Sequence, residues 1–214
     1  MSLEFHDIVV SAWRWLCGLS FGAISGLALA LLVRPSQITR DYSVHLASFF
    51  RALPILALVP VVSKFIGIGE VAKVLLISWA CFFPVFISTV RASSDRIVDL
   101  ELRIDAVGLG KVARFRHYEL PRTLFGFLAG VEISVGIGWL TVVAAEFLGT
   151  FATGPFRGGL GDAVFVSFNN NNYSTGFLCL ALFGILGVMS SIAWRGLSLV
   201  VVRAAGFSSQ SSGW

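Results

Sequence analysis

Long apolar stretches alternate with short polar ones along most of this sequence. A helix needs about 20 apolar residues to cross the hydrocarbon core of a bilayer, and five segments come close to that length or exceed it. Residues 15–33 contain no charged side chain, and 46–66 contain Arg51 and Lys64 only near the ends, where long basic side chains reach the lipid headgroups. The predicted membrane-spanning helices are 15–33, 46–66, 74–90, 123–148 and 173–194.

Proline occurs inside two of these predicted helices. Pro54 and Pro60 fall in the second helix, which is therefore predicted to be kinked or broken, because proline lacks an amide hydrogen and clashes with the preceding helical turn. Pro84 falls in the third. A proline in a membrane helix either shapes it for packing or contributes to a site, and the sequence leaves both interpretations open for Pro54 and Pro84.

Residues 91–122 differ in character from the rest of the chain. This segment carries seven Lys or Arg residues with acidic groups among them, so we expect it to lie outside the bilayer. Apolar residues recur at three- and four-residue steps on either side of Gly108 and Gly110. The pattern predicts two short amphipathic helices joined at a glycine bend. Without further signals, such a segment is read as a solvated connection on the membrane surface.

Composition and charge agree with a membrane protein. Hydrophobic residues make up 56% of the 214 residues and charged residues only 13%, whereas soluble domains carry about 25% charged residues. We therefore predict one transmembrane domain over residues 1–214, in contact with membrane lipid. The net charge of +4 is explained by basic residues that stay in cytoplasmic loops, so no nucleic-acid partner is expected.

The distribution of basic residues predicts the orientation. If residues 91–122 are cytoplasmic, twelve Lys or Arg residues lie inside and four lie outside. An odd number of spans then puts the N-terminus outside and the C-terminus in the cytoplasm. Acidic Glu4 and Asp7 stand where a signal peptide would be basic, so we do not expect a cleaved signal peptide.

Several motifs, in the same order along the chain, resemble permeases of the ABC importers for nitrate, sulfonate, taurine and bicarbonate. Gly108 is followed twelve residues later by Leu120-Pro121, as in the cytoplasmic loop of that family, and the basic run around Phe115 resembles the second half of the loop. The resemblance covers nearly the whole chain from Trp15 to Arg203. The flanking segments that match are Arg51 to Pro54, Val59-Pro60, Phe65 to Lys73, Phe82 to Pro84, Gly138 to Glu146 and Gly159 to Gly161.

The resemblance implies an all-α, polytopic membrane domain with the type I ABC importer permease fold. It implies a bacterial inner-membrane subunit that forms the path for a small solute, such as one of these anions. The implied partners are two ABC ATPase subunits, a second permease copy and an extracytoplasmic solute-binding protein. The expected coupling residues in segment 91–122 are Asp105, Ala106, Gly108, Gly110, Phe115, Leu120 and Pro121.

We expect no enzymatic activity from this chain. It has no phosphate-binding Gly-x-x-x-x-Gly-Lys-Ser/Thr loop, so ATP hydrolysis is expected on a partner subunit. Its histidines are scattered, and Cys17, Cys81 and Cys179 each fall in an apolar run, which indicates reduced packing residues. No metal site, catalytic residue or cofactor is therefore expected.

The sequence also departs from the resembling family. Leu102, Arg103 and Ile104 stand where the family has a Glu-Ala-Ala triplet, and Glu132 stands where it commonly has an arginine. Relatives of this type generally carry another spanning helix ahead of the one at Trp15. Its expected absence here agrees with the orientation predicted from charge.

Two carboxylates fall within the predicted span 123–148. A carboxylate inside a membrane marks a path or a paired charge, and for Glu132 both interpretations stay open. Glu146 follows 14 residues later, on nearly the same helix face and near the outer end, where a gate, a docking role or interfacial exposure are alternatives. Trp139 lies between them. The candidates for a translocation path or gate are Glu132, Glu146, Trp139, Pro54 and Pro84.

Two other functions compete with the importer hypothesis. A secondary transporter or channel would work without ATPase partners, but many secondary transporters contain inverted repeats, and no convincing repeat relates the two halves of this sequence. The third alternative is a structural membrane subunit without a path, for which Glu132 inside a span would be unusual.

Overall fold

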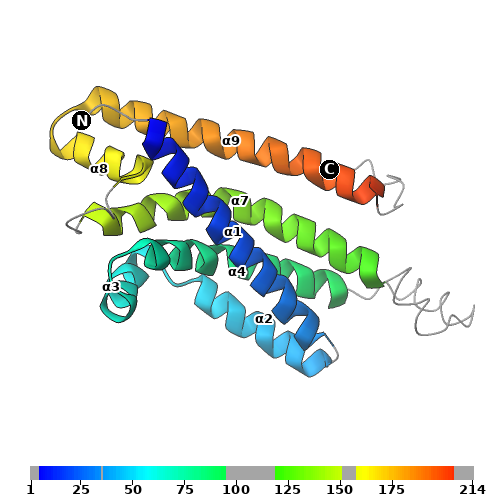
Figure 1. Ribbon diagram of the computed structural model, residues 1–214. Coiled ribbons are helices and arrows are strands. Elements are labelled where there is room, and N and C mark those ends of the chain that lie inside the picture. The colour runs from blue at the N-terminus through cyan, green and yellow to red at the C-terminus, as the bar shows by residue number, and fades with distance from the viewer. Residues whose placement is uncertain (1–4, 35, 95–118, 151–157, 205–214) are drawn as a thin grey trace, which may run out of the picture.

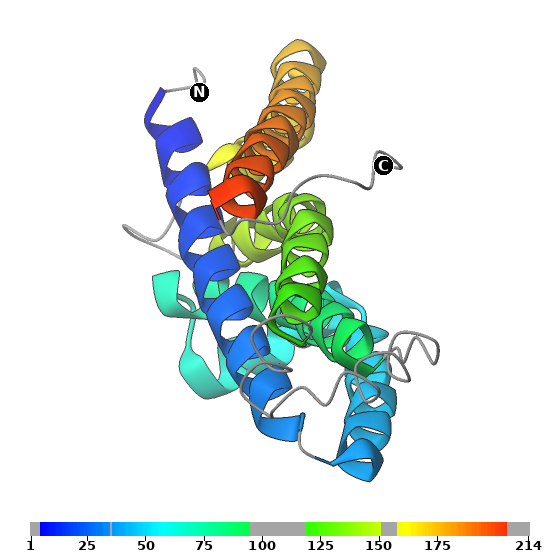
Figure 2. The ribbon, with the colours of Figure 1, turned by 90° about the vertical axis from the view of Figure 1, so that its right-hand side faces the viewer.

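The described part of the chain is a bundle of α-helices. The computed structural model describes residues 5–34, 36–94, 119–150 and 158–204. The helices are α1 (Phe5–Val33), α2 (Gln37–Arg51), α3 (Ile55–Ile66), α4 (Glu70–Ser94), α7 (Leu120–Thr150), α8 (Leu160–Asn169) and α9 (Tyr173–Ala204). Layers of α9, α7, α4 and α2 follow one another, and α1 crosses α7 and α4 obliquely (Figure 1). The view in Figure 2, at right angles, shows the same order of layers.

Four of these helices, α1, α4, α7 and α9, are long and apolar enough to cross a membrane. The second predicted span, 46–66, is not one helix. α2 and α3 are separated by a short break and bent by 89° relative to each other. The break lies at Pro54, which has an extended backbone (φ −67°, ψ 125°) directly before α3. The predicted break is confirmed, and the pair makes a fifth crossing if both helices belong to one span.

The helix ends differ from the predicted ones where charged residues occur. α1 begins ten residues earlier than the predicted 15–33 and includes Arg14, and α4 begins at Glu70 rather than at 74. α2 begins at Gln37 rather than at 46, and its start is capped by Ser36, whose Oγ accepts a hydrogen bond from Thr39 N at 3.3 Å. A prediction from hydropathy ends a span at a charged residue, because it assigns every charged side chain to water. The helix itself can continue through such a residue.

The central helix α4 packs most extensively against α7 and α1. Glycines make the closest approaches to α4: Gly18, Gly22 and Gly26 of α1, and Gly126 and Gly130 of α7. A Cβ atom added to Gly22 would lie 2.7 Å from the carbonyl oxygen of Ser78. One added to Gly130 would lie 2.6 Å from the Cα of Val85. Small residues therefore let the backbones of these membrane helices pack in direct contact.

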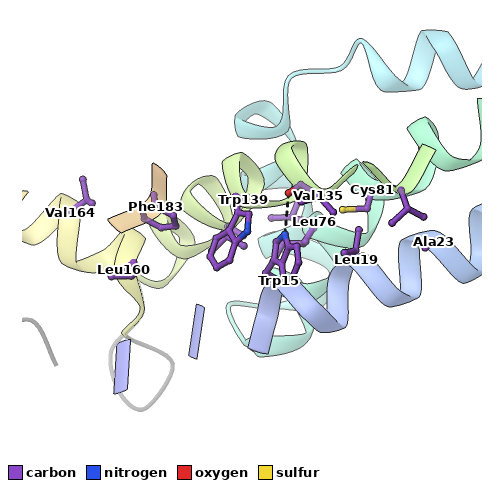
Figure 3. Packing of buried hydrophobic residues seen from close by; sticks show 14 of the residues in the cluster. Trp15, Leu19, Ala23, Leu76, Cys81, Val135, Trp139, Leu160, Val164 and Phe183 are labelled. Carbon is purple, nitrogen blue, oxygen red and sulfur yellow. Dashed lines mark hydrogen bonds between the residues drawn. The ribbon is translucent and has the colours of Figure 1, made fainter. Parts of the chain in front are cut away.

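The largest core cluster lies where α1, α4 and α7 meet, and α8 and α9 close it on one side. The rings of Trp15 and Trp139 stack with their centroids 5.2 Å apart (Figure 3). Trp15 Nε1 also donates a hydrogen bond to the carbonyl oxygen of Val135 at 3.2 Å. On the other side of Trp139, the ring of Phe183 on α9 packs edge-on at 6.0 Å. Trp139 thus joins three helices within the core.

The bundle has two distinct ends. The starts of α1 and α4, the end of α7 and α8 meet at the first end, through the contacts of Arg14 and Glu146 described below. At the second end, Arg34 after α1 forms an ion pair with Glu119 before α7. The end of α4 and the start of α7 lie side by side there (Figure 1). These two helix ends flank segment 91–122, most of which lies outside the described residues.

Candidate functional site

A buried cluster of charged side chains joins the helices at the first end. Arg14 of α1 is 2% exposed and donates from Nε and Nη2 to the two carboxylate oxygens of Glu70, each at 2.6 Å. Its Nη1 donates to Glu146 Oε1 at 2.8 Å and to the carbonyl oxygen of Gly158 at 2.7 Å. All three guanidinium nitrogens are used, and the two-pronged contact with Glu70 is the strongest geometry for such a pair. Lys73, also buried, donates to Glu70 Oε1 at 3.3 Å.

Glu146 is fully buried, and both of its oxygens accept hydrogen bonds. Oε1 accepts from Ser11 Oγ at 2.7 Å as well as from Arg14, and Oε2 accepts from the backbone N–H of Gly161 at 2.7 Å. Ser11 Oγ in turn accepts from Leu160 N at 2.8 Å. The end of α7 is thereby tied to α1 and to the first residues of α8.

The glycines at the start of α8 are required by this carboxylate. A Cβ atom on Gly159 would lie 2.3 Å from Glu146 Oε1, and Gly159 has a φ of 112°, which side chains other than glycine rarely adopt. A Cβ atom on Gly161 would lie 3.0 Å from the Glu146 side chain. The Gly-Leu-Gly sequence therefore lets the backbone approach the buried carboxylate closely enough to donate to it.

The contacts of Glu146 cross-link α7 to α1 and α8, and its gate and docking roles stay predictions. Each carboxylate oxygen of Glu146 has donors at hydrogen-bond distance, and its side chain is 0% exposed. Interfacial exposure, one of the alternatives for this residue, does not occur. Buried charges of this kind are tolerated because they are paired and hydrogen-bonded.

A second feature, a groove of about 450 Å³, lies between α7 and α9. Its lining residues are Gly136, Trp139, Leu140, Val143, Phe183, Gly184, Gly187, Val188, Ser191, Ile192 and Arg195. Cβ atoms added to Gly136 or Gly184 would meet no atom within 4 Å, so the glycines keep this groove open. Trp139 is part of this lining, and its Nε1 donates to Ser190 Oγ at 3.0 Å.

Glu132 lies beside this groove and pairs with Arg195. Arg195 Nε of α9 donates to Glu132 Oε1 of α7 at 2.7 Å, and the two side chains are 71% and 42% exposed, respectively. Glu132 and Glu146, although predicted on nearly the same face of one helix, thus have different partners. Glu132 faces α9 at an exposed position, while Glu146 faces α1 and α8 in the interior.

The remaining sequence-predicted residues do not join either feature. Pro54 lies at the break between α2 and α3, and Pro84 lies inside α4 without interrupting it. Leu120 and Pro121 form the first turn of α7. The other expected coupling residues, Asp105, Ala106, Gly108, Gly110 and Phe115, lie outside the described residues.

The partners of the two carboxylates were not predicted from the sequence. Arg14 and Lys73 directly precede two of the predicted spans, and the structure buries both side chains. Arg195 directly follows the predicted span 173–194, whereas in the structure α9 continues past it and its side chain pairs with Glu132. For the buried cluster one signal was available: Arg14 and Lys73 directly precede two predicted spans and Glu146 lies near the end of a third, so their opposite charges could meet at one end of the bundle. For Glu132, in the middle of its predicted span, there was no such signal.

Within the described ranges, no three His, Cys, Asp or Glu side chains come together as metal ligands. Cys17, Cys81 and Cys179 are unpaired thiols, and the last two are buried. The chemistry available at both features is therefore charge pairing and hydrogen bonding.

Comparison with known proteins identifies the family. Residues 18–201 match the family described as binding-protein-dependent transport system inner membrane component. The chain belongs to this family. The resemblance inferred from the motifs is thereby confirmed, and the chain is a multi-pass membrane protein with several apolar helices of spanning length.

Three curated relatives illustrate the similarity. SsuC of Bacillus subtilis (strain 168), named for aliphatic sulfonates transport, is 33% identical over 68% of this chain and 53% of its own length. TauC of Escherichia coli (strain K12), a taurine transport system permease protein, is 29% identical over 67% of this chain and 52% of its own. The nitrate import permease protein NrtB of Leptolyngbya laminosa is 25% identical over 86% and 64%. The chain spans about half the length of the first two of these relatives.

Solved structures show the same fold. A chain of the MetNI methionine ABC transporter, in an inward facing crystal form, superposes with a TM-score of 0.67 over 92% of this chain and 94% of its own, at 19% identity. A second crystal form gives a TM-score of 0.64 over 94% and 99%. The predicted all-α, type I ABC importer permease fold is confirmed for this member of the binding-protein-dependent transport family.

Proposed function

We propose that this chain is the permease subunit of an ATP-driven importer for a small anion. Membership of the family of binding-protein-dependent transport inner membrane components carries this proposal. The relatives named for aliphatic sulfonates, taurine and nitrate support the substrate class, since each of these solutes carries a sulfonate or an oxyanion group. The chain would form half of the translocation path, as a single transmembrane domain over residues 1–214.

The proposed partners are two ABC ATPase subunits, a second permease copy and an extracytoplasmic solute-binding protein. ATP hydrolysis would take place on the ATPase subunits, and segment 91–122 would dock onto them. α4 and α7, the helices that flank this segment, pack closely along their glycine contacts. A movement of the segment would therefore shift the two helices together, and the cluster around Arg14 would carry the shift to α1 and α8.

Copurification tests the proposal directly. We expect the tagged chain, expressed with an ABC ATPase from the same organism, to purify as a stable complex that hydrolyses ATP faster when a loaded solute-binding protein is added. Gly108→Val should uncouple the subunits, because a β-branched side chain opposes the glycine bend expected there. Gly108→Ala is the milder matched variant. Unchanged association and stimulation in Gly108→Val would refute the coupling role, and anion uptake by the chain alone would favour a secondary transporter or channel.

The proposed orientation places the first end of the bundle outside and the second end in the cytoplasm of a bacterial inner membrane. Ser36, after α1, and Asn170, after α8, are exposed at opposite ends. In a variant without native cysteines, Asn170→Cys should react with an impermeant thiol reagent in intact cells. Ser36→Cys should react only after the cells are opened. The reverse pattern would show that the orientation is inverted.

A further inference from the structure

The exposed ion pair between Glu132 and Arg195 lies well inside the length of the membrane helices. At 1.5 Å per residue, Glu132 is about 18 Å from the start of α7 and about 27 Å from its end. Charged side chains in hydrocarbon are strongly disfavoured, and those found in membrane helices face protein or water-filled cavities. The face of α7 and α9 that carries the pair is therefore not covered by lipid chains.

Arg195 keeps most of its donors available. Only its Nε is engaged, by Glu132 Oε1 at 2.7 Å. Within the part of the chain that the structure describes, Nη1 and Nη2 have no hydrogen-bond acceptor, and the side chain is 71% exposed. A guanidinium group presents a planar fork of N–H donors that matches the oxygens of a carboxylate or sulfonate. The free edge of Arg195 thus offers an anion a two-pronged contact.

The groove next to this guanidinium has mostly apolar walls. Arg195 and Ser191 are the polar side chains of the lining, together with the indole of Trp139. The apolar walls are formed by Leu140, Val143, Phe183, Val188 and Ile192. A small inorganic anion would leave these walls in contact with water, whereas an anion with a short aliphatic chain would cover them. Ligand sites of this kind combine apolar walls with a few placed polar groups.

We propose that Arg195 and the groove between α7 and α9 form a binding site on the translocation path for an organic anion with a short aliphatic chain. This rests on the proposed function and narrows its substrate class. The anionic group binds Nη1 and Nη2 of Arg195, and the aliphatic chain lies along the groove over Gly184 and Trp139. Glu132 orients Arg195 when the site is empty, and it competes with the bound anion for the same positive charge.

Binding measurements on the 214-residue chain in lipid nanodiscs test the site. The probes are methanesulfonate, butanesulfonate, hexanesulfonate and butyltrimethylammonium, titrated by calorimetry. Sulfonates are suitable because they stay ionised across the working pH range. We expect affinity to rise about fourfold for each methylene group until the groove is filled, from the burial of apolar surface. The cation should not bind.

Three substitutions separate the parts of the site. Arg195→Gln should weaken the binding of every sulfonate about tenfold or more, because a charge-assisted hydrogen bond is lost. Glu132→Gln should strengthen it severalfold, since the competing carboxylate is removed. Gly184→Leu should weaken hexanesulfonate binding but leave methanesulfonate unchanged, because the added side chain occupies open space in the groove. Arg203→Gln and Gly196→Leu, on the same helix but outside the lining, are the matched controls and should bind as the unaltered chain does.

Two results would overturn the site. One is equal binding of sulfonates by Arg195→Gln and the unaltered chain. The other has two parts: the unaltered chain binds no sulfonate, and Gly184→Leu changes the oligomeric state. That result would mean that a second copy of the chain occupies the groove. Copurification with the ATPase is measured on the same variants. If the ATPase copurifies but no sulfonate binds, only the site is wrong, and if sulfonates bind but no ATPase copurifies, the site stands and the proposed importer function fails.

Discussion

Arg14→Met should lower the free energy of unfolding by about 3–5 kcal/mol, the usual effect of removing one partner of a buried ion pair. The substitution leaves Glu146 fully buried with no cation bonded to it, and it removes both hydrogen bonds to Glu70. Methionine keeps most of the packing volume, so the loss reports the charge contacts. The measurement is thermal unfolding of the 214-residue chain in detergent, followed by size-exclusion fluorescence.

Two comparisons show whether the buried pair is the cause. Arg51→Met removes an exposed arginine at the end of α2 and should change stability by less than about 0.5 kcal/mol. The double variant Arg14→Met with Glu146→Gln removes the buried charge along with its partner and should recover part of the loss. If the loss of stability in the double variant equals the sum of the losses in the two single variants, the two side chains do not interact.

Gly130→Ala should destabilise the chain by about 1–3 kcal/mol, although alanine is the better helix former. The added Cβ would lie 2.6 Å from the Cα of Val85 and 2.9 Å from the carbonyl oxygen of Pro84, so the backbones of α4 and α7 must separate. Thermal unfolding in detergent measures the effect.

Gly136→Ala is the matched control for this variant, because it lies on the same helix with no atom within 4 Å of the added Cβ. It should leave stability unchanged or raise it by up to about 1 kcal/mol through helix propensity alone. Equal effects of the two substitutions would contradict close packing of α7 on α4.

Much of the fold could be predicted because membrane helices are encoded locally. The apolar lengths of 15–33, 74–90, 123–148 and 173–194 each correspond to one long helix. The broken second span followed from the chemistry of Pro54. The sharpness of that bend, 89°, did not follow, because it depends on how α3 packs against α4 and α7.

The partners within the candidate sites could not be predicted, because they come from distant parts of the sequence. Arg14 and Glu146 are separated by 132 positions, and Glu132 and Arg195 by 63. The sequence showed that both carboxylates are unusual in a membrane span, because only the neighbouring residues are needed to see this. It did not show their partners, which are distant in the sequence. Whether each is buried or exposed depends on which helices pack beside α7 at its depth: Glu146 meets α1 and α8 near the end of α7, whereas Glu132, 14 residues earlier, meets α9.

The cluster around Arg14 also sets an order of assembly during synthesis. A ribosome that adds about 5–20 residues per second needs on the order of 10 s to proceed from Arg14 to Glu146, 132 positions later. Glu70 is made earlier and can pair with Arg14 first, but the contacts of Gly158 and Gly161 follow still later. The end of α1 that carries Arg14 is therefore completed only when α7 and α8 have left the ribosome. Until then, the insertion machinery must hold a helix whose arginine still lacks part of its final surroundings.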